Sequence, residues 1–466
     1  MNSTGQEVSE LSPEPMHWAT PAPTSERIKT GRRLRKVIPR SRMADLAPRS
    51  RDPLDILEEQ NSTRVPELVP LRRERMAESP FAFYRGAAAV MASDLSNEPT
   101  TEVHVASCGD AHLANFGFYA SPQRTLVFDL NDFDEAAWAP WEWDLKRLVA
   151  SIILAGQAAG RKEHVVREGA IGAVGAYAQA LRVSTTMTPL DRFYTHFDAE
   201  GGTKNLPKSA RRNLEQTIRQ AKKRTSERAA RKLTAPDEDG RMRFIEQPPT
   251  MTRLPDETGK RAIELHQKYM DGANPEIRQL LRNYGVSDVI RRVVGVGSVG
   301  TQCTISLLED GDGNALILQS KEANQSVLEQ YGKIEQPKAL KDAIDRKGQG
   351  ARVVGMQRIL QAVSDPFLGP VQAYRYDLYV RQFHDMKGSI DTDGVGTASY
   401  LAYSRACGTT LARAHSQSPL AATVSGYVGG GSEVAEALWK WGNAYAERTV
   451  EDHRRFVEER LRPQNP

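Results

Sequence analysis

An acidic segment near the front of the chain constrains the fold more than any other stretch. A loop opened by glycine, Cys108-Gly109-Asp110-Ala111-His112, is followed by an amide at Asn115, and a second acidic cluster spans Asp129 to Asp134. Phosphoryl transfer uses one carboxylate to accept the proton of the acceptor hydroxyl, and an amide oxygen with another carboxylate to hold Mg²⁺. We therefore expect Asp110 to be the catalytic residue and Asn115 with Asp132 to be metal ligands.

Several neighbouring side chains leave alternatives open. Asp129 and Asp134 are the other candidate metal ligands, because the acidic cluster allows more than one register. His112 is a second candidate base, although a histidine in such a loop more often bonds to the backbone. Asp144 stands near the start of an expected helix, where its carboxylate would accept backbone N–H groups and steady the catalytic loop. The plain alternative is an acid-rich turn that faces solvent.

The pattern G-D-x-H-x-x-N, followed by D-F-D, resembles the catalytic and metal-binding loops of the protein-kinase-like superfamily. The branch of aminoglycoside and choline kinases is the closest in style, and it carries a later D-L pair that here is Asp144-Leu145. This resemblance implies a two-lobed α+β fold with ATP as phosphoryl donor and Mg²⁺ as cofactor.

A second motif lies past the middle of the chain. Gly295-Val296-Gly297-Ser298-Val299-Gly300 follows an expected strand over residues 289–294. The pattern G-x-G-x-x-G is weak by itself, and a dinucleotide-binding fingerprint would require a helix next. Instead, β-rich runs follow over residues 303–308 and 315–319, with an Asp-Gly turn between them. This order predicts a kinase-like nucleotide flap, in which the glycines let backbone N–H groups approach phosphates.

Two cations are candidate phosphate ligands. Lys321 ends the third of these expected strands, and it resembles the lysine that pairs with the α- and β-phosphates in kinases. Its usual partner is a glutamate on the next helix. Glu329 and Glu335 are near, but the helix expected over residues 350–358 has no glutamate, which leaves the partner open. Arg85 lies in an expected amphipathic helix; its guanidinium suits phosphate oxygens, and a structural ion pair is the alternative.

The order of these motifs differs from that of ordinary kinases. In kinases the glycine loop comes first, whereas here Asp110 precedes Gly295, which predicts a circular permutation. The segment from Tyr403 to His415 resembles the kinase helix that runs directly into the catalytic loop, and in this chain it stands near the C-terminal end. A permutation cut before the loop would leave it there.

Five segments together resemble a bacterial family known as domain of unknown function 2252. They are Ser79 to Gly86, Cys108 to His112, Asn131 to Glu135, Trp141 to Leu148 and Leu411 to His415. The resemblance covers most of the chain, and the family is grouped with the kinase-like fold. Because no substrate is established for this family, the resemblance implies the fold but does not indicate which reaction the protein catalyses.

The 466 residues are expected to divide into five parts. Residues 1–54 are rich in Pro, Ser, Thr and Arg, which predicts a disordered basic tail. The other expected parts are a catalytic-loop portion of the C-lobe (55–200), a helical basic insertion (201–284), an N-lobe-like β-sheet with the glycine-rich loop (285–390) and a helical portion of the C-lobe (391–466).

Composition narrows the class of protein. Hydrophobic residues make up 39% of the chain and charged residues 26%, which favours a globular core over wholesale disorder. The net charge of +4 is too weak alone to indicate nucleic-acid binding. Three distant cysteines fit neither a disulfide scaffold nor a zinc site. Since neither a secretory signal nor a bilayer-spanning apolar run is visible, we expect a soluble cytoplasmic protein without a membrane partner.

Together these features predict an ATP- and Mg²⁺-dependent phosphotransferase that acts on a hydroxyl group of an unidentified small molecule or protein. Three alternatives stay open. One is the transfer of AMP on the same scaffold, and another is a nucleotide-binding protein without catalysis. The third is a nucleic-acid-binding protein that uses the basic residues 204–233, although such a charge run is more often a solvated helix face.

Overall fold

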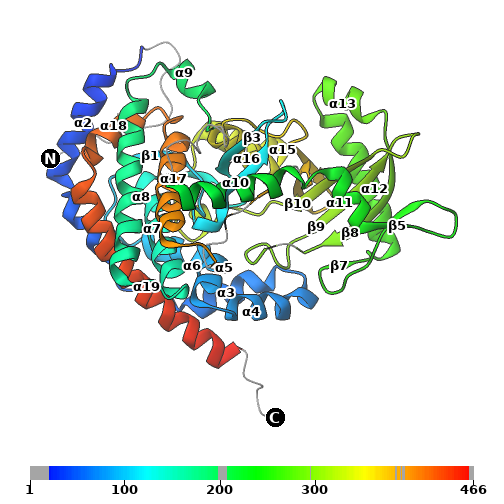
Figure 1. Cartoon of the computed structure of the whole chain (residues 1–466), viewed down its shortest axis with the longest axis horizontal. Helices are drawn as coiled ribbons and strands as arrows, with labels where there is room; N and C mark the ends of the chain where they lie inside the picture. The colour runs from blue at the N-terminus through cyan, green and yellow to red at the C-terminus, as the bar shows by residue number, and fades with distance from the viewer. Residues whose placement is uncertain are drawn as a thin grey trace.

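The fold is a mixed α+β arrangement with antiparallel sheets, which confirms the expected α+β class. Most of the long helices gather on one side of the molecule and the largest sheet lies on the other (Figure 1). The computed structural model describes residues 20–197, 207–293, 295–383, 386–388, 390 and 394–460.

The first part of the chain is mostly helical. In order it contains α2 (Thr24–Val37), η1 (Arg40–Ala44), α3 (Pro53–Ser62), η2 (Pro66–Leu68), α4 (Val69–Ala77), α5 (Pro80–Gly86), α6 (Ala88–Leu95), β1 (His104–Ser107), η3 (Leu113–Asn115), β2 (Phe116–Ala120), β3 (Leu126–Leu130), β4 (Ala137–Pro140), α7 (Trp141–Ala158), α8 (Glu163–Ser184) and α9 (Pro189–Tyr194).

The second part carries the main sheet and the closing helices. It contains α10 (Lys208–Lys222), α11 (Ser226–Leu233), β5 (Thr234–Pro236), β6 (Met242–Phe244), β7 (Met251–Thr252), α12 (Asp256–Gly272), α13 (Pro275–Leu281), β8 (Gly285–Arg292), β9 (Cys303–Glu309), β10 (Ala315–Glu322), α14 (Val327–Gln330), α15 (Lys338–Lys347), α16 (Gln349–Leu360), β11 (Gly369–Ala373), β12 (Tyr376–Gln382), α17 (Thr397–His415), α18 (Ala421–Val428) and α19 (Ser432–Arg460).

The largest sheet has six antiparallel strands in the order β11-β12-β10-β9-β8-β7. Residues 295–300 form the turn between β8 and β9, and no helix follows the glycines because β9 begins at Cys303. The dinucleotide-binding alternative is therefore wrong. Lys321 lies in β10, opposite Cys303 on β9 and Tyr379 on β12. The expected succession of strand, glycine turn, strand, turn and strand is confirmed.

The acidic segment is built on two short antiparallel strand pairs. β2 and β3 form an antiparallel hairpin. β1 pairs with β4 and leads into the loop that starts at Cys108. α7 follows β4 directly and is buried over nearly its whole length, because it packs against α8, α17 and α19. The two acidic loops are thus attached to a rigid hairpin and to a core helix.

The predicted disordered tail over residues 1–54 is wrong for its second half. α2 packs against α18 and η1 packs against α19, whereas residues 1–19 lie outside the described residues. Arg35 of α2 donates from Nε to the Tyr427 carbonyl (2.9 Å) and from Nη2 to the Gly426 carbonyl (2.6 Å). This arginine is ordered because it satisfies the open carbonyls at the end of α18.

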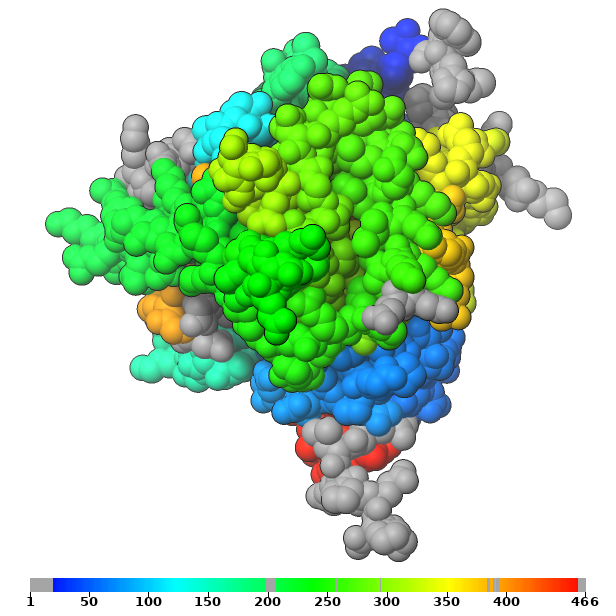
Figure 2. Space-filling model, turned by 90° about the vertical axis from the view of Figure 1, so that its right-hand side faces the viewer, coloured from blue at the N-terminus to red at the C-terminus, as the bar shows by residue number. Residues whose placement is uncertain are grey.

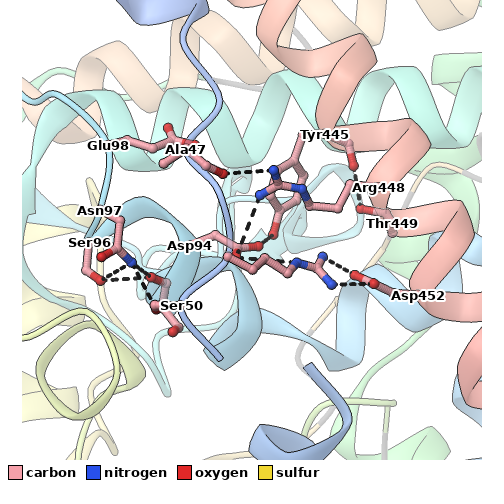
Figure 3. Close-up of polar contacts among 12 residues, drawn as sticks. Ala47, Ser50, Asp94, Ser96, Asn97, Glu98, Tyr445, Arg448, Thr449 and Asp452 are labelled. Carbon is pink, nitrogen blue, oxygen red and sulfur yellow. Dashed lines mark hydrogen bonds and ion pairs between the residues drawn. The ribbon is translucent and has the colours of Figure 1, made fainter. Parts of the chain in front are cut away.

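An ionic network ties the segment after η1 to α6 and α19 (Figure 3). Arg49 forms a bidentate pair with Asp452 of α19, and its Nε lies 3.5 Å from Oδ1 of Asp94 on α6. Asp94 also accepts the hydroxyl of Tyr445 (3.0 Å). Since both carboxylates are nearly buried, these contacts hold the N-terminal segment firmly on the helical core.

The basic stretch over residues 204–233 forms the expected pair of exposed helices, α10 and α11; its first residues, 204–206, lie outside the described part. α10 packs on α17 and α11 packs on β10, so the pair reaches from the helical side to the sheet (Figure 1). The remaining domain boundaries stay predictions.

Two further features concern the whole described chain. None of its helices within the described ranges combines the length and the apolar character that a membrane span requires. All three cysteines, Cys108, Cys303 and Cys407, are free thiols in buried positions.

Candidate functional site

Most of the predicted site residues line one cavity of about 580 Å³, which we call the central cavity. It lies between the acidic loops, the glycine turn and the ends of α3 and α14. Figure 2 shows the blue residues of α3 and α4 directly against the green residues of the sheet region. The predicted residues among its lining are Asp110, Asn115, Asp132, Gly295, Gly297 and Ser298. Gly300 and Lys321 are not part of the lining.

Lys321 connects the sheet to the second acidic loop. Its side chain is buried, and its ammonium contacts the Asp134 carboxylate and lies 3.5 Å from Oδ1 of Asp132. Tyr379 donates its hydroxyl to Asp134 (2.6 Å). Burial disfavours the charged amine, but the two carboxylates outweigh it and raise the pKa of Lys321 well above its ordinary value. The partner that the sequence left open is therefore an aspartate of the acidic loop, not a glutamate of a following helix.

The three candidate metal ligands of the second acidic cluster, Asp129, Asp132 and Asp134, have different surroundings. Both carboxylate oxygens of Asp129 accept backbone N–H groups at 2.9 Å, and this side chain is buried outside the cavity lining. Asp134 is engaged by the lysine and the tyrosine. Asp132 lines the cavity, and its buried Oδ1 makes no hydrogen bond among the described residues and has only the ion pair with Lys321 at 3.5 Å. Asp132 is thus the acid whose oxygen is best placed to receive a cation.

Asp110 is held in a fixed orientation by α7 and by its own loop. Arg147 donates from Nε to Oδ1 of Asp110 (2.8 Å) and forms an ion pair with the same oxygen through Nη2 (2.7 Å), while Nε2 of His112 lies 3.5 Å from Oδ2. The side-chain amide of Asn115 donates to the Asp110 backbone carbonyl (2.6 Å). The Asp110 side chain keeps 19% of its surface exposed, so its carboxylate stays accessible to a hydroxyl group in the cavity.

The predicted role of Asp144 as an anchor of the loop is confirmed. Its carboxylate accepts the backbone N–H groups of Cys108 (2.6 Å) and Gly109 (2.9 Å). His415, at the end of α17, places Nε2 3.2 Å from Asp144, and the Tyr177 hydroxyl bonds to its Nδ1 (2.8 Å). The loop that carries the candidate catalytic residue is therefore fixed by α7 and by a helix near the other end of the chain.

The glycine turn is positioned by the N-terminal helices. Arg75 donates from Nη1 to the Gly295 carbonyl (2.6 Å), and Val65 donates its N–H to the Gly300 carbonyl (2.8 Å). Gly295 and Gly300 have φ angles of +75° and +92°, a region that favours glycine. Gly300 therefore shapes the turn, while Gly295 and Gly297 form part of the cavity wall.

Three arginines, Arg64, Arg85 and Arg147, lie near the two acidic loops. Of these, the sequence predicted only Arg85 as a candidate phosphate ligand. Arg85 lines the cavity, and its Nε is buried without a partner among the described residues. Arg64 lines it as well and donates to the Val299 carbonyl of the glycine turn. Sequence reasoning missed Arg64 and Arg147. The signal for Arg147 was its position three residues after Asp144, since helical i,i+3 spacing places both side chains on one face.

The buried His112 makes the stability of the fold depend on pH. Its side chain is 3% exposed, and burial lowers its pKa to about 4, so it is neutral at pH 7 and a weak base. An unfolded histidine titrates near pH 6.5, so between about pH 6.5 and 4 the unfolded state binds more protons and stability falls as the pH falls. We expect His112→Asn to remove about 3 kcal/mol of this pH dependence. Urea unfolding between pH 4 and 7 measures it, and equal slopes for both proteins would contradict it.

The comparisons with known proteins identify a family. The family model described as "Uncharacterized protein conserved in bacteria (DUF2252)" matches residues 64–459, a span that contains all the site residues named above. The comparison with curated proteins and the comparison with solved structures find no match. Because the family model covers most of the sequence, the chain belongs to the DUF2252 family.

Proposed function

We propose that this protein is an ATP- and Mg²⁺-dependent phosphotransferase with a hydroxyl acceptor. The observation that carries the proposal is the central cavity, where the two acidic loops and the glycine turn meet. Lys321 and Asp134, separated by 187 positions in the sequence, contact each other beside it. An acidic loop that served only as a solvated turn would not need these distant partners.

Each part of the site supports one step of phosphoryl transfer. Asp110, oriented by Arg147, accepts or orients the proton of the acceptor hydroxyl. Arg85 and the backbone of the glycine turn bind the phosphates, because a guanidinium and backbone N–H groups match phosphate oxygens. Lys321, buried behind the cavity wall, holds Asp134 and adds positive charge beside the phosphates. Catalysis on such a site rests on positioning and on electrostatic stabilisation.

The side chains present fit Mg²⁺. Asp132 offers a buried oxygen without a hydrogen-bond partner in the described structure, and Asn115 lines the same cavity. Among the described residues, no group of three or more His, Cys, Asp or Glu side chains could hold a metal, but two oxygen ligands are sufficient for an ion that keeps several waters. When bound by Asp132 and Asn115, Mg²⁺ would neutralise charge on the transferring phosphoryl group.

We also propose that the fold is a circularly permuted form of the two-lobed kinase-like arrangement. The neighbourhood of the loop supports this. α17, the helix that would precede the loop in an unpermuted chain, ends at His415 beside Asp144. The segment after it also reaches β1, because the Ala106 N–H donates to Oγ of Ser418 (2.8 Å). A direct link from α17 to β1 would thus be short.

A thermal-shift experiment tests the proposed function. ATP with Mg²⁺ is expected to stabilise the wild type by about 2.7 kcal/mol at 100 times the Kd, whereas ATP with EDTA stabilises it less. Asp132→Asn should lose most of the Mg²⁺-dependent part, because it loses the anionic ligand. Asp312→Asn, in the exposed turn between β9 and β10, is the matched control and should behave as wild type. Equal stabilisation of Asp132→Asn, or no effect of ATP on the wild type, would reject the proposal.

A further inference from the structure

A second cavity, of about 360 Å³, lies between α10, α11 and the end of β8. It shares no lining residue with the central cavity. Five of its lining side chains are cations and none is acidic. We call it the basic groove and define it by Lys223, Arg224, Arg228, Lys232 and Arg292.

The backbone brings these cations together. Arg228 and Lys232 are one helical turn apart on α11, so they share a face. Lys223 and Arg224 stand at the elbow between α10 and α11. Thr225 fixes the elbow, because its hydroxyl accepts the Arg228 N–H (3.3 Å) at the start of α11. Like charges at this spacing repel one another, so the cluster destabilises the free protein unless an anion compensates it.

The described structure supplies no such compensation. Lys223, Arg228 and Lys232 form no ion pair with a carboxylate of the described chain. Arg292 has Nε and Nη1 buried without hydrogen-bond partners among the described residues. Burial lowers the pKa of Arg292; Cys303 opposes this shift and the nearby Arg75 adds to it, and no carboxylate is among the causes. Arg292 is therefore a half-buried residue whose guanidinium has two buried nitrogens without partners, and beside a cavity this indicates a missing anionic ligand.

We propose that the basic groove binds a compact anion with several phosphate groups, a polyphosphorylated small molecule. Arginine and lysine side chains are the usual ligands of phosphate oxygens. No aromatic side chain is among the described residues that line the groove, so the bases of a single-stranded nucleic acid would have nothing to stack on. Arg292 ends the strand that leads into the glycine turn, so the bound anion would contact the same strand that carries this turn.

Calorimetric titration of the full chain with inorganic tripolyphosphate tests the proposal. The groove variant Arg228→Ala/Lys232→Ala is expected to bind at least about tenfold more weakly than the wild type. The control variant Arg219→Ala/Arg231→Ala removes two exposed cations from the same helices outside the groove and should stay within about twofold. Hydrogen exchange should slow on addition of tripolyphosphate over residues 221–233 in the wild type and in the control variant.

Three results would overturn the proposal. One is wild-type protein that does not bind tripolyphosphate, or a groove variant that binds it as well as the wild type does. Another is an equal loss in the control variant, which would indicate a diffuse field instead of a site. The third is tighter binding of a single-stranded oligonucleotide that the groove variant loses, since this would assign the groove to nucleic acid. The groove and the central cavity share no residue, so a difference between the groove variant and the control variant reports on the groove alone. The phosphotransferase proposal is tested separately by the ATP and Mg²⁺ thermal shift of the Asp132→Asn variant.

Discussion

Asp110→Asn is expected to abolish the consumption of ATP while leaving ATP bound. Loss of a positioned acid or base lowers rates by about 10²–10⁴-fold. Asparagine keeps an oxygen for the Arg147 contact, so the loop should keep its shape. The phosphates and Mg²⁺ would be held by other residues, so binding should change little. ATP turnover measures the first effect, and the Mg²⁺-dependent thermal shift measures the second.

The same comparison distinguishes catalysis from support of the fold. Wild-type turnover in Asp110→Asn would remove Asp110 from catalysis. Loss of both turnover and binding, with a lowered melting temperature, would indicate that Asp110 only holds the loop. Intact-mass analysis of the product separates an added phosphate from an added AMP, which tests the alternative of nucleotidyl transfer. Asp312→Asn, exposed in a turn away from both loops, serves as control.

Lys321→Met is expected to have the largest effect on stability. The lysine is 4% exposed and is the cation that faces Asp132 and Asp134 from β10. Its removal leaves two adjacent carboxylates without their cation. Breaking a buried ion pair costs about 3–5 kcal/mol of unfolding free energy, and we expect a loss of about 3 kcal/mol because these carboxylates border the cavity. Mg²⁺ should restore part of this loss, since a divalent cation can replace the missing charge. Urea unfolding with Mg²⁺ and with EDTA measures both effects.

A second lysine provides the control for this experiment. Lys338 pairs with Asp342 on the surface of α15, and its side chain is 76% exposed. Lys338→Met should therefore change stability by no more than about 1 kcal/mol, with no dependence on Mg²⁺. Equal losses of unfolding free energy in the two variants would mean that the contacts of Lys321 with the acidic loop stabilise the fold no more than a surface ion pair does. ATP binding should weaken in Lys321→Met alone.

The local parts of the site were predictable from the sequence because local chemistry determines them. The glycine turn and the strands around it follow from glycines that adopt positive φ and from β-rich runs on either side. The anchoring by Asp144 followed from the position of an acid near the start of a helix. Membership of the DUF2252 family, expected from five short segments, is confirmed over residues 64–459.

What the sequence did not provide was pairing between distant segments. The partner of Lys321 is Asp134, which the chain reaches only by folding the sheet back over the acidic loop. The order of α2 depends on carbonyl groups at Gly426 and Tyr427, near the opposite end of the chain, so composition alone predicted a disordered tail. Local patterns contain no information about such contacts until the fold is known.

The three buried thiols allow the opening of this fold to be followed region by region. Cys108 lies in the acidic loop, Cys303 in β9 and Cys407 in α17. Burial raises the pKa of each thiol, so none is a reactive thiolate while its surroundings stay closed. An alkylating reagent can modify a given cysteine only after that region has opened. The order in which the three become modified therefore ranks the loop, the sheet and the helix by their local stability.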